Sequence, residues 1–87
     1  MMYELEVPEH LDKEFRKLAK KNKKQLEIIQ KKIEEILENP EHYKPLRGDM
    51  HGARRVHIDK SFVLTYEIDR VINVVRLLDY DHHDKIY

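Results

Sequence analysis

The spacing of apolar side chains changes along this chain, and the changes determine which secondary-structure elements it can form. Residues 3–7 alternate apolar and acidic side chains, and this period of two predicts a short strand that Pro8 ends. Further along, apolar residues recur three or four positions apart, as on the buried stripe of an amphipathic helix. The pattern predicts helices over 9–21 and 24–38, separated by a polar break and ended by an Asn-Pro pair.

The second half of the chain returns to a period of two. Both glycines and two of the three prolines fall within 40–52, so this stretch is predicted to be a loop. Strands are predicted over 54–59, 62–68 and 71–78, and the short connections between them favour an antiparallel meander. Residues 79–87 are too polar for a core strand and too short for a stable helix, so we expect a tail that lies back on the sheet.

These elements predict an α+β fold with the order β-α-α-β-β-β. Because a short polar connection joins the two amphipathic helices, we expect a helical hairpin whose joined apolar stripes pack on a small antiparallel sheet. A chain of 87 residues has room for one hydrophobic core, so residues 1–87 are expected to form a single domain.

Composition excludes several classes of protein. Cysteine is absent, which rules out disulfides, thiolate catalysis and Cys-based zinc sites. No apolar run approaches the ~18 residues of a membrane span, and the N-terminus lacks the pattern of a signal peptide, so we expect a cytoplasmic protein. The 17 Lys and Arg residues balance 17 Asp and Glu residues. Local clusters therefore matter more than the net charge, and residues 13–24 hold seven of the basic side chains.

The strand predicted over 54–59 carries the most informative pair of side chains. Its period of two puts Val56 and Ile58 in the core under the helices. Arg55 and His57 then share the uncovered face of the sheet. A titratable imidazole beside a guanidinium suits the binding of phosphate, although ordinary solvated polar residues give the same pattern.

The C-terminal tail supplies a second group of titratable side chains. His82 and His83 are adjacent and are bracketed by aspartates. If the tail crosses the open face of the meander, one of these imidazoles meets Arg55 and His57, and the three groups suffice for general acid–base cleavage of RNA without a metal ion. The same His and Asp side chains could instead ligate a metal ion, but no standard spacing such as His-x-x-x-His is present. A solvated, disordered terminus is the third interpretation.

Two residues of the later strands are ambiguous. Arg76 interrupts the apolar run of the last predicted strand, and it is either a solvated edge residue or an anion ligand on the functional face. Tyr66 lies on an apolar face of its strand, which favours a packed role over a catalytic one.

Several short segments occur in a characteristic order and spacing. They are Pro-Leu-Arg-Gly at 45–48, Gly52, Val-His-Ile at 56–58, Val-Leu-Thr-Tyr at 63–66 and His-His-Asp-Lys-Ile-Tyr at 82–87. Together with the order β-α-α-β-β-β, these segments resemble the RelE/ParE superfamily of type II toxins over essentially the whole chain. The histidines make the chain more similar to the RelE and YafQ branches, which cut messenger RNA in the ribosomal A site, than to the gyrase-directed ParE branch.

The resemblance implies an endoribonuclease, an mRNA interferase that needs neither metal nor cofactor and leaves a 2′,3′-cyclic phosphate. It implies His57 and His83 as the acid–base pair, with His82 as the neighbouring option. Arg55 is then the phosphate ligand, and Tyr87 is a supporting residue near the site. Further contacts to phosphate or RNA are expected at Arg47, Arg54, Lys60 and Arg76.

The resemblance also implies partners and leaves alternatives open. The expected partners are a small cognate antitoxin that wraps the toxin and hides the site, messenger RNA and the ribosome, with no membrane involved. One feature departs from the family: the arginine expected just before the Leu-x-Tyr motif is missing, and the nearest cation is Lys60. The alternatives are a catalytically inactive member that serves as an antitoxin-binding or co-repressor module, and a ParE-like gyrase inhibitor.

Overall fold

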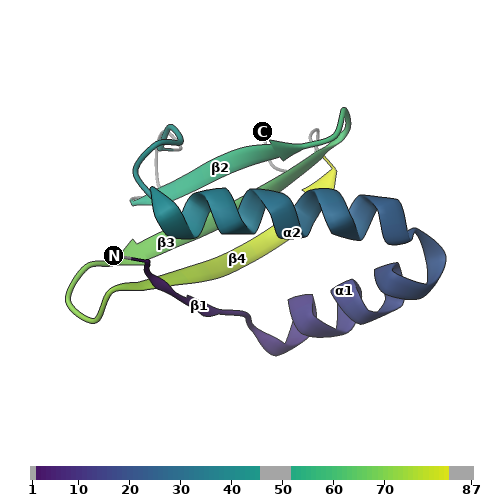
Figure 1. Ribbon diagram of the computed structural model, residues 1–87, viewed down its shortest axis with the longest axis horizontal. Helices are drawn as coiled ribbons and strands as arrows, with labels where there is room; N and C mark the ends of the chain where they lie inside the picture. Colours follow the sequence, from purple (N-terminus) through teal and green to yellow (C-terminus); the bar gives the residue numbers. More distant parts are fainter. Residues whose placement is uncertain (1, 46–51, 83–87) are drawn as a thin grey trace.

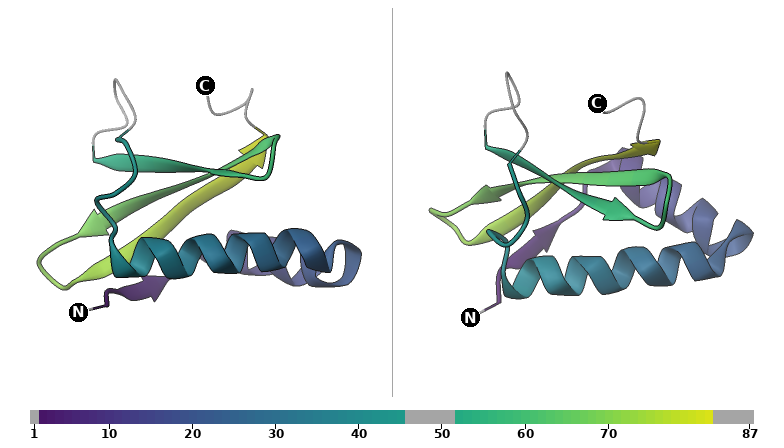
Figure 2. Two further views of the ribbon diagram at one scale, coloured as in Figure 1. Left: turned by 45° about the horizontal axis from the view of Figure 1, so that its top comes forward. Right: turned by 90° about the horizontal axis from the view of Figure 1, so that it is seen from above.

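The computed structural model describes residues 2–45 and 52–82 and has two layers, a pair of helices and a sheet (Figure 1). The elements are β1 (Glu4–Glu6), α1 (Glu9–Lys21), α2 (Lys23–Glu38), β2 (Ala53–Ile58), β3 (Phe62–Asp69) and β4 (Val74–His82). The predicted order β-α-α-β-β-β and the α+β class are confirmed. Turned views show both helices on the same face of the sheet (Figure 2).

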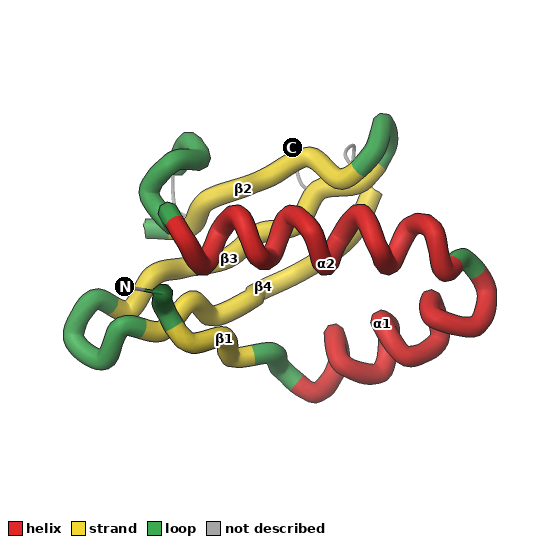
Figure 3. The backbone as a smooth tube through the Cα atoms, viewed as in Figure 1, coloured by secondary structure: helices red, strands yellow, loops and turns green. Residues whose placement is uncertain are grey.

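A single residue, Asn22, separates α1 from α2. Its backbone N–H donates to the carbonyl of Leu18 at 2.8 Å, which closes α1. Its side chain accepts a hydrogen bond from the backbone N–H of Gln25 at 3.1 Å, which caps α2. Because of this cap α2 begins at Lys23, one residue before the predicted start, whereas α1 spans the predicted 9–21. The two helices form the expected hairpin (Figure 3).

The sheet has the strand order β1-β4-β3-β2, so β1 and β2 are its edges. Strands β2, β3 and β4 form the predicted antiparallel meander. Strand β1 joins parallel to β4, with Glu4 opposite Val74 and Glu6 opposite Arg76, so the sheet is mixed rather than wholly antiparallel. The pattern within a three-residue strand carries no information about a partner 70 residues away, which is why this pairing was not predicted.

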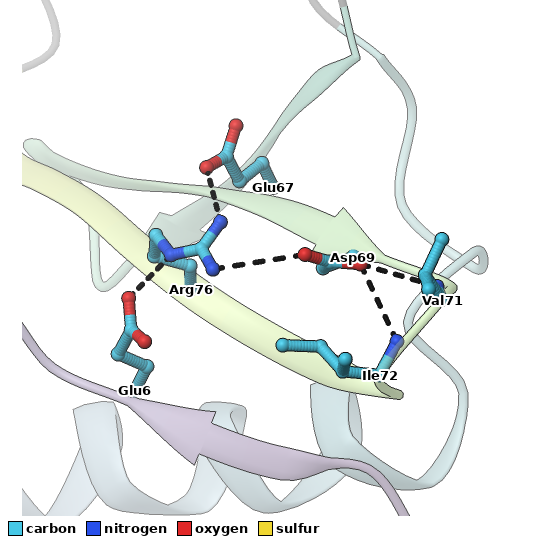
Figure 4. A network of polar contacts seen from close by, with 6 residues as sticks. All are labelled: Glu6, Glu67, Asp69, Val71, Ile72 and Arg76. Carbon is cyan, nitrogen blue, oxygen red and sulfur yellow. Dashed lines mark hydrogen bonds and ion pairs between the residues drawn. The ribbon is translucent and has the colours of Figure 1, made fainter.

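The turn between β3 and β4 is longer than predicted, and it occupies residues 70–73. An oxygen of the Asp69 carboxylate accepts hydrogen bonds from the backbone N–H of Val71 at 3.1 Å and of Ile72 at 3.4 Å (Figure 4). Asn73 completes the turn in the left-handed region, with φ of 56°. The prediction of strand from residue 71 was therefore wrong, and Val71 is 92% exposed instead of paired.

Strand β4 continues to His82, so the prediction of a tail from residue 79 was wrong for 79–82. Tyr80 is 5% exposed, and its ring stacks on that of Phe62 with centroids 5.0 Å apart. Its hydroxyl also accepts a hydrogen bond from Nε2 of Gln25 at 2.9 Å. These contacts hold a polar segment in the sheet that its composition alone does not favour. The rest of the expected tail, 83–87, lies outside the described residues.

A bulge in β4 puts Tyr80 on the face of the sheet where it makes these contacts. Leu77 and Asp79 lie opposite consecutive residues of β3, which leaves Leu78 as an extra residue. Because one extra residue reverses the alternation of side chains, Tyr80 joins Leu77 on the face that carries the helices.

The core lies between the helical hairpin and the sheet. It contains the buried side chains Leu11, Ile29, Ile36, Val56, Ile58, Leu64, Tyr66, Val75, Leu77 and Tyr80. Tyr66 is fully buried, so its predicted packed role is confirmed. No helix in the described part of the chain is long and apolar enough to cross a membrane.

Candidate functional site

The alternation predicted for β2 is confirmed. Val56 and Ile58 are 3% and 0% exposed in the core beneath the helices. Arg55 and His57 therefore lie on the opposite face of the sheet, where His57 is exposed. Because β2 is an outer strand, this pair also lies at an edge of the sheet (Figure 1).

A polar concavity with a volume of about 350 Å³ lies at this edge. Its walls come from α2, from the segment 40–45 and from β2, and its lining residues are Lys32, Tyr43, Lys44, Arg55, Val56 and His57. The structure thus joins the predicted pair to two lysines and a tyrosine that the sequence reasoning missed. No local pattern marks these three residues, because only the docking of the loop on β2 brings them to the site.

Arg54 holds the loop against β2. Its guanidinium nitrogen Nη1 donates to the backbone carbonyls of Tyr43 at 2.6 Å and of Glu41 at 3.4 Å. The backbone N–H of Arg55 also donates to the carbonyl of Lys44 at 3.4 Å. Since neighbouring strand residues face opposite ways, Arg54 lies on the helix side of β2, away from His57. Arg54 therefore supports the wall of the concavity and does not line it.

Tyr66 fastens the other end of the same segment. Its hydroxyl donates a buried hydrogen bond to the backbone carbonyl of Pro40 at 2.5 Å. Burial raises the pKa of Tyr66 to about 12, so its hydroxyl keeps its proton across the neutral range. Arg70, from the β3–β4 turn, adds an ion pair to Glu41 at 2.8 Å. Two strand side chains, Arg54 and Tyr66, and one turn side chain, Arg70, thus fix residues 40–45 beside β2.

One carboxylate, that of Glu35, partly neutralises the positive charge beside the concavity. Oε2 of Glu35 accepts a hydrogen bond from the Tyr43 hydroxyl at 3.2 Å and lies 3.5 Å from Nζ of Lys32. Burial and then the charge of Glu35 raise the pKa of Tyr43, so this phenol is a hydrogen-bond donor near neutral pH. The lining residues in the described part of the chain include two lysines and an arginine and no Asp or Glu, so the lining itself carries a net positive charge.

The structure separates His82 from His57. His57 lies opposite Val63 on β3, and Val63 lies opposite Asp81 on β4, so these three residues share one face of the sheet. His82 is the next residue along β4 and points the other way, where its ring lies on that of Phe62 with centroids 4.4 Å apart. The expectation that His82 meets His57 is not supported by this arrangement.

Arg76 shares the face of Arg55 and His57, but carboxylates surround its guanidinium. It hydrogen-bonds to Glu6 on β1 and to Glu67 on β3 at 2.8 Å, and it lies 3.8 Å from Asp69 (Figure 4). The hydrogen bonds to Glu67 and Glu6 raise the pKa of Arg76 above its ordinary value. These ion pairs cross-link three strands, and their negative charge disfavours a bound phosphate at this position.

Of the remaining predicted residues, only Lys60 belongs to the described part of the chain, and it does not line the concavity. Lys60 is exposed in the turn between β2 and β3, beside Asp59 with its φ of 55°. Arg47, His83 and Tyr87 lie outside the described residues. Within 2–45 and 52–82, no group of three or more His, Asp or Glu side chains is arranged to hold a metal ion.

A second, apolar groove of about 620 Å³ lies between the two helices and β1. Its apolar lining comes from both layers and includes Leu5, Val7, Phe15, Ala19, Leu26, Ile29 and Ile33. Asp12, Arg16, Gln30 and Glu34 also line it. Leu5 is 39% exposed in this groove, so part of the apolar surface is open to solvent.

Comparison with known proteins identifies relatives along nearly the whole chain. The model of the family described as ParE toxin of type II toxin–antitoxin system, parDE, matches residues 5–87. A Methanosarcina mazei protein is 60% identical over 86 residues, which are 99% of this chain and 100% of that protein. A Methanocaldococcus jannaschii protein that bears the toxin name RelE4 is 52% identical, over 99% of this chain and 92% of its own.

Solved structures share the same fold. A mutant of the Escherichia coli toxin RelE in the free state superimposes with a TM-score of 0.74 and 31% identity, covering 92% of this chain and 82% of that chain. The toxin–antitoxin complex RelBE2 of Mycobacterium tuberculosis gives a TM-score of 0.76 at 21% identity, covering 95% of this chain and 100% of that chain.

Proposed function

This chain belongs to the ParE toxin family of the RelE/ParE superfamily, the toxins of type II toxin–antitoxin systems. From that premise we propose that it is an endoribonuclease that cuts messenger RNA on the ribosome. The observation that carries the proposal is the position of His57 beside Arg55 in a positively charged concavity at the edge of β2. An imidazole within a cationic site can serve as a general acid or base in phosphodiester cleavage.

The proposed reaction is a transesterification within the RNA chain. His57 takes the proton from a ribose 2′-hydroxyl, and the 2′-oxygen attacks the adjacent phosphorus. The bond to the 5′-oxygen breaks, and a general acid protonates that leaving oxygen. The products are a 2′,3′-cyclic phosphate and a free 5′-hydroxyl, and no water is consumed. Arg55 neutralises the additional negative charge that gathers on the phosphorane.

We assign the general acid to His83. The packing of His82 on Phe62, on the face opposite to His57, favours the neighbouring histidine for this role. Tyr87 is retained as a supporting residue on the strength of the family resemblance. Arg54 is assigned to the support of the loop and Arg76 to the cross-linking of strands, because their guanidinium groups are engaged by carbonyls and carboxylates respectively.

We propose a cognate antitoxin as the protein partner, and we place one of its segments in the apolar groove between α1, α2 and β1. Type II systems pair each toxin with an antitoxin, and the groove offers apolar side chains that the described chain leaves partly open. An amphipathic helix is the element that such a groove between helices accommodates best.

The test of the function is a translation extract supplied with the purified protein. Messenger RNA engaged by ribosomes should be cut, and the new 3′ ends should carry a 2′,3′-cyclic phosphate. Ends that carry a linear 3′-hydroxyl would contradict the proposed chemistry, and intact messenger RNA under every ribosomal condition would remove the enzyme.

One observation favours a second candidate, a toxin without ribonuclease activity. Val63, just before the Leu-Thr-Tyr segment, is 0% exposed and supplies no cation where the family expects an arginine. Such a chain would act as an antitoxin-binding module or, as in the ParE branch, on gyrase. Expression without antitoxin separates the candidates, because loss of messenger RNA, DNA damage and undisturbed growth are three different outcomes.

A further inference from the structure

The concavity at the edge of β2 holds two cations that the proposed reaction does not use. Lys32 comes from α2, and Lys44 comes from the loop that docks on β2. We propose that Lys32 and Lys44 form a second phosphate-binding position, so that the ligand is a single RNA strand which crosses the edge of β2. This inference rests on the proposed function, because it extends the same site.

The position of the concavity supports a strand that crosses the edge. Arg55 and His57 lie on the face of the sheet away from the helices, whereas Lys32 belongs to a helix that packs on the other face. A concavity lined by all of them passes around the outer strand from one face to the other. A mononucleotide would occupy one side only, whereas an oligonucleotide can place consecutive phosphates on both sides.

One of the two lysines at the second position has no carboxylate partner among the described residues, and the other is only partly neutralised. Lys44 forms no ion pair within the described residues, and Lys32 shares Glu35 with the hydroxyl of Tyr43. By contrast, the charge of Arg70 is paired with Glu41 at 2.8 Å. A lysine side chain near a phosphate acts as a point charge, and such contacts contribute to affinity by the release of counterions.

The loop that carries Lys44 is fixed before any ligand binds. The carbonyl of Lys44 accepts a hydrogen bond from the backbone of Arg55, and Arg54 holds the adjacent residue Tyr43 through its carbonyl. The backbone that carries Lys44 is therefore held beside Arg55. A lysine on an ordered backbone loses less conformational entropy on binding than one on a mobile loop.

The experiment measures binding of a 2′-O-methyl oligoribonucleotide, which lacks the hydroxyl needed for cleavage. The double variant Lys32→Ala with Lys44→Ala is compared with wild type over a series of salt concentrations. Loss of this one phosphate-binding position should make the slope of log K against log salt less steep by about 0.7. The matched control is Lys24→Ala with Lys31→Ala, which removes two exposed lysines of α2 outside the concavity and should leave the slope near that of wild type.

The outcomes separate this inference from the proposed function. A reduced slope in the double variant supports the second position even if the protein never cuts messenger RNA. An unchanged slope, or an equal reduction in the control pair, overturns the second position even if cleavage is demonstrated. Absence of any binding to the oligonucleotide by wild type also overturns it.

Discussion

At the scale of single residues, two side chains on opposite faces of the sheet differ in their exposure and their contacts. His57 lies in a concavity with Arg55 and is exposed, so its imidazole is accessible to a ligand. Tyr66 is fully buried, and its hydroxyl is used to hold Pro40. The pattern of alternation predicted both facings correctly, because each follows from the period of two within a single strand.

The hydrogen bond from Tyr66 to Pro40 gives the first prediction. Tyr66→Phe leaves a buried carbonyl without its donor, and it should lower the free energy of unfolding by about 1–3 kcal/mol, measured by urea denaturation. Because the folded-state pKa of about 12 lies above the unfolded value of 10, the wild-type contribution is present below pH 10 and is lost as pH rises toward 12. The phenylalanine variant should lack this part of the alkaline loss, and an identical alkaline profile would contradict the assignment.

At the scale of elements, the loop at 40–45 is the part of the site that the sequence could not place. The glycines and prolines of 40–52 predicted a loop, but not that residues 40–45 dock on β2 and bring Tyr43 and Lys44 to the site. That docking depends on Arg54 and on pairing across the chain, which no local pattern encodes. The end of β4 was missed for a related reason, since Tyr80 holds a polar segment in the sheet by contacts with distant residues.

The support given by Arg54 can be measured as a positioning effect. Arg54→Ala frees the carbonyls of Tyr43 and Glu41, and the loosened loop should raise KM for ribosome-bound messenger RNA severalfold while the rate of the chemical step changes less than twofold. Arg54→Lys should restore part of the loss, because a lysine reaches one of the two carbonyls. A fall in the rate at saturating substrate, with KM unchanged, would instead place Arg54 in the chemistry.

At the scale of the whole molecule, two surfaces on different sides of the hairpin have different chemistry. The concavity at β2 is positively charged, and the groove between α1, α2 and β1 is largely apolar. The fold class and the meander were predictable because they follow from hydrophobic periodicity. Neither surface was predictable, because each is formed by elements that only the tertiary fold brings together. The parallel pairing of β1 with β4 was unpredictable for the same reason.

The groove predicts a steric test for the antitoxin partner. Ala19 is exposed at the groove wall, so Ala19→Trp should fill the groove without disturbing the core and should weaken antitoxin binding at least tenfold in calorimetry. Lys20→Trp is the matched control, since it adds the same side chain at the adjacent exposed position outside the groove. Equal affinities for both variants would show that the antitoxin binds elsewhere.

The measurement that most directly tests the role of His57 is the single-turnover rate of cleavage of ribosome-bound messenger RNA. His57→Ala should reduce this rate by about 10²–10⁴-fold, as expected when a general acid or base is removed. His10→Ala, which removes an exposed imidazole in the first turn of α1, should cleave at the wild-type rate. Cleavage by His57→Ala at the wild-type rate would contradict the assignment of acid–base chemistry to the face of β2 that carries Arg55 and His57.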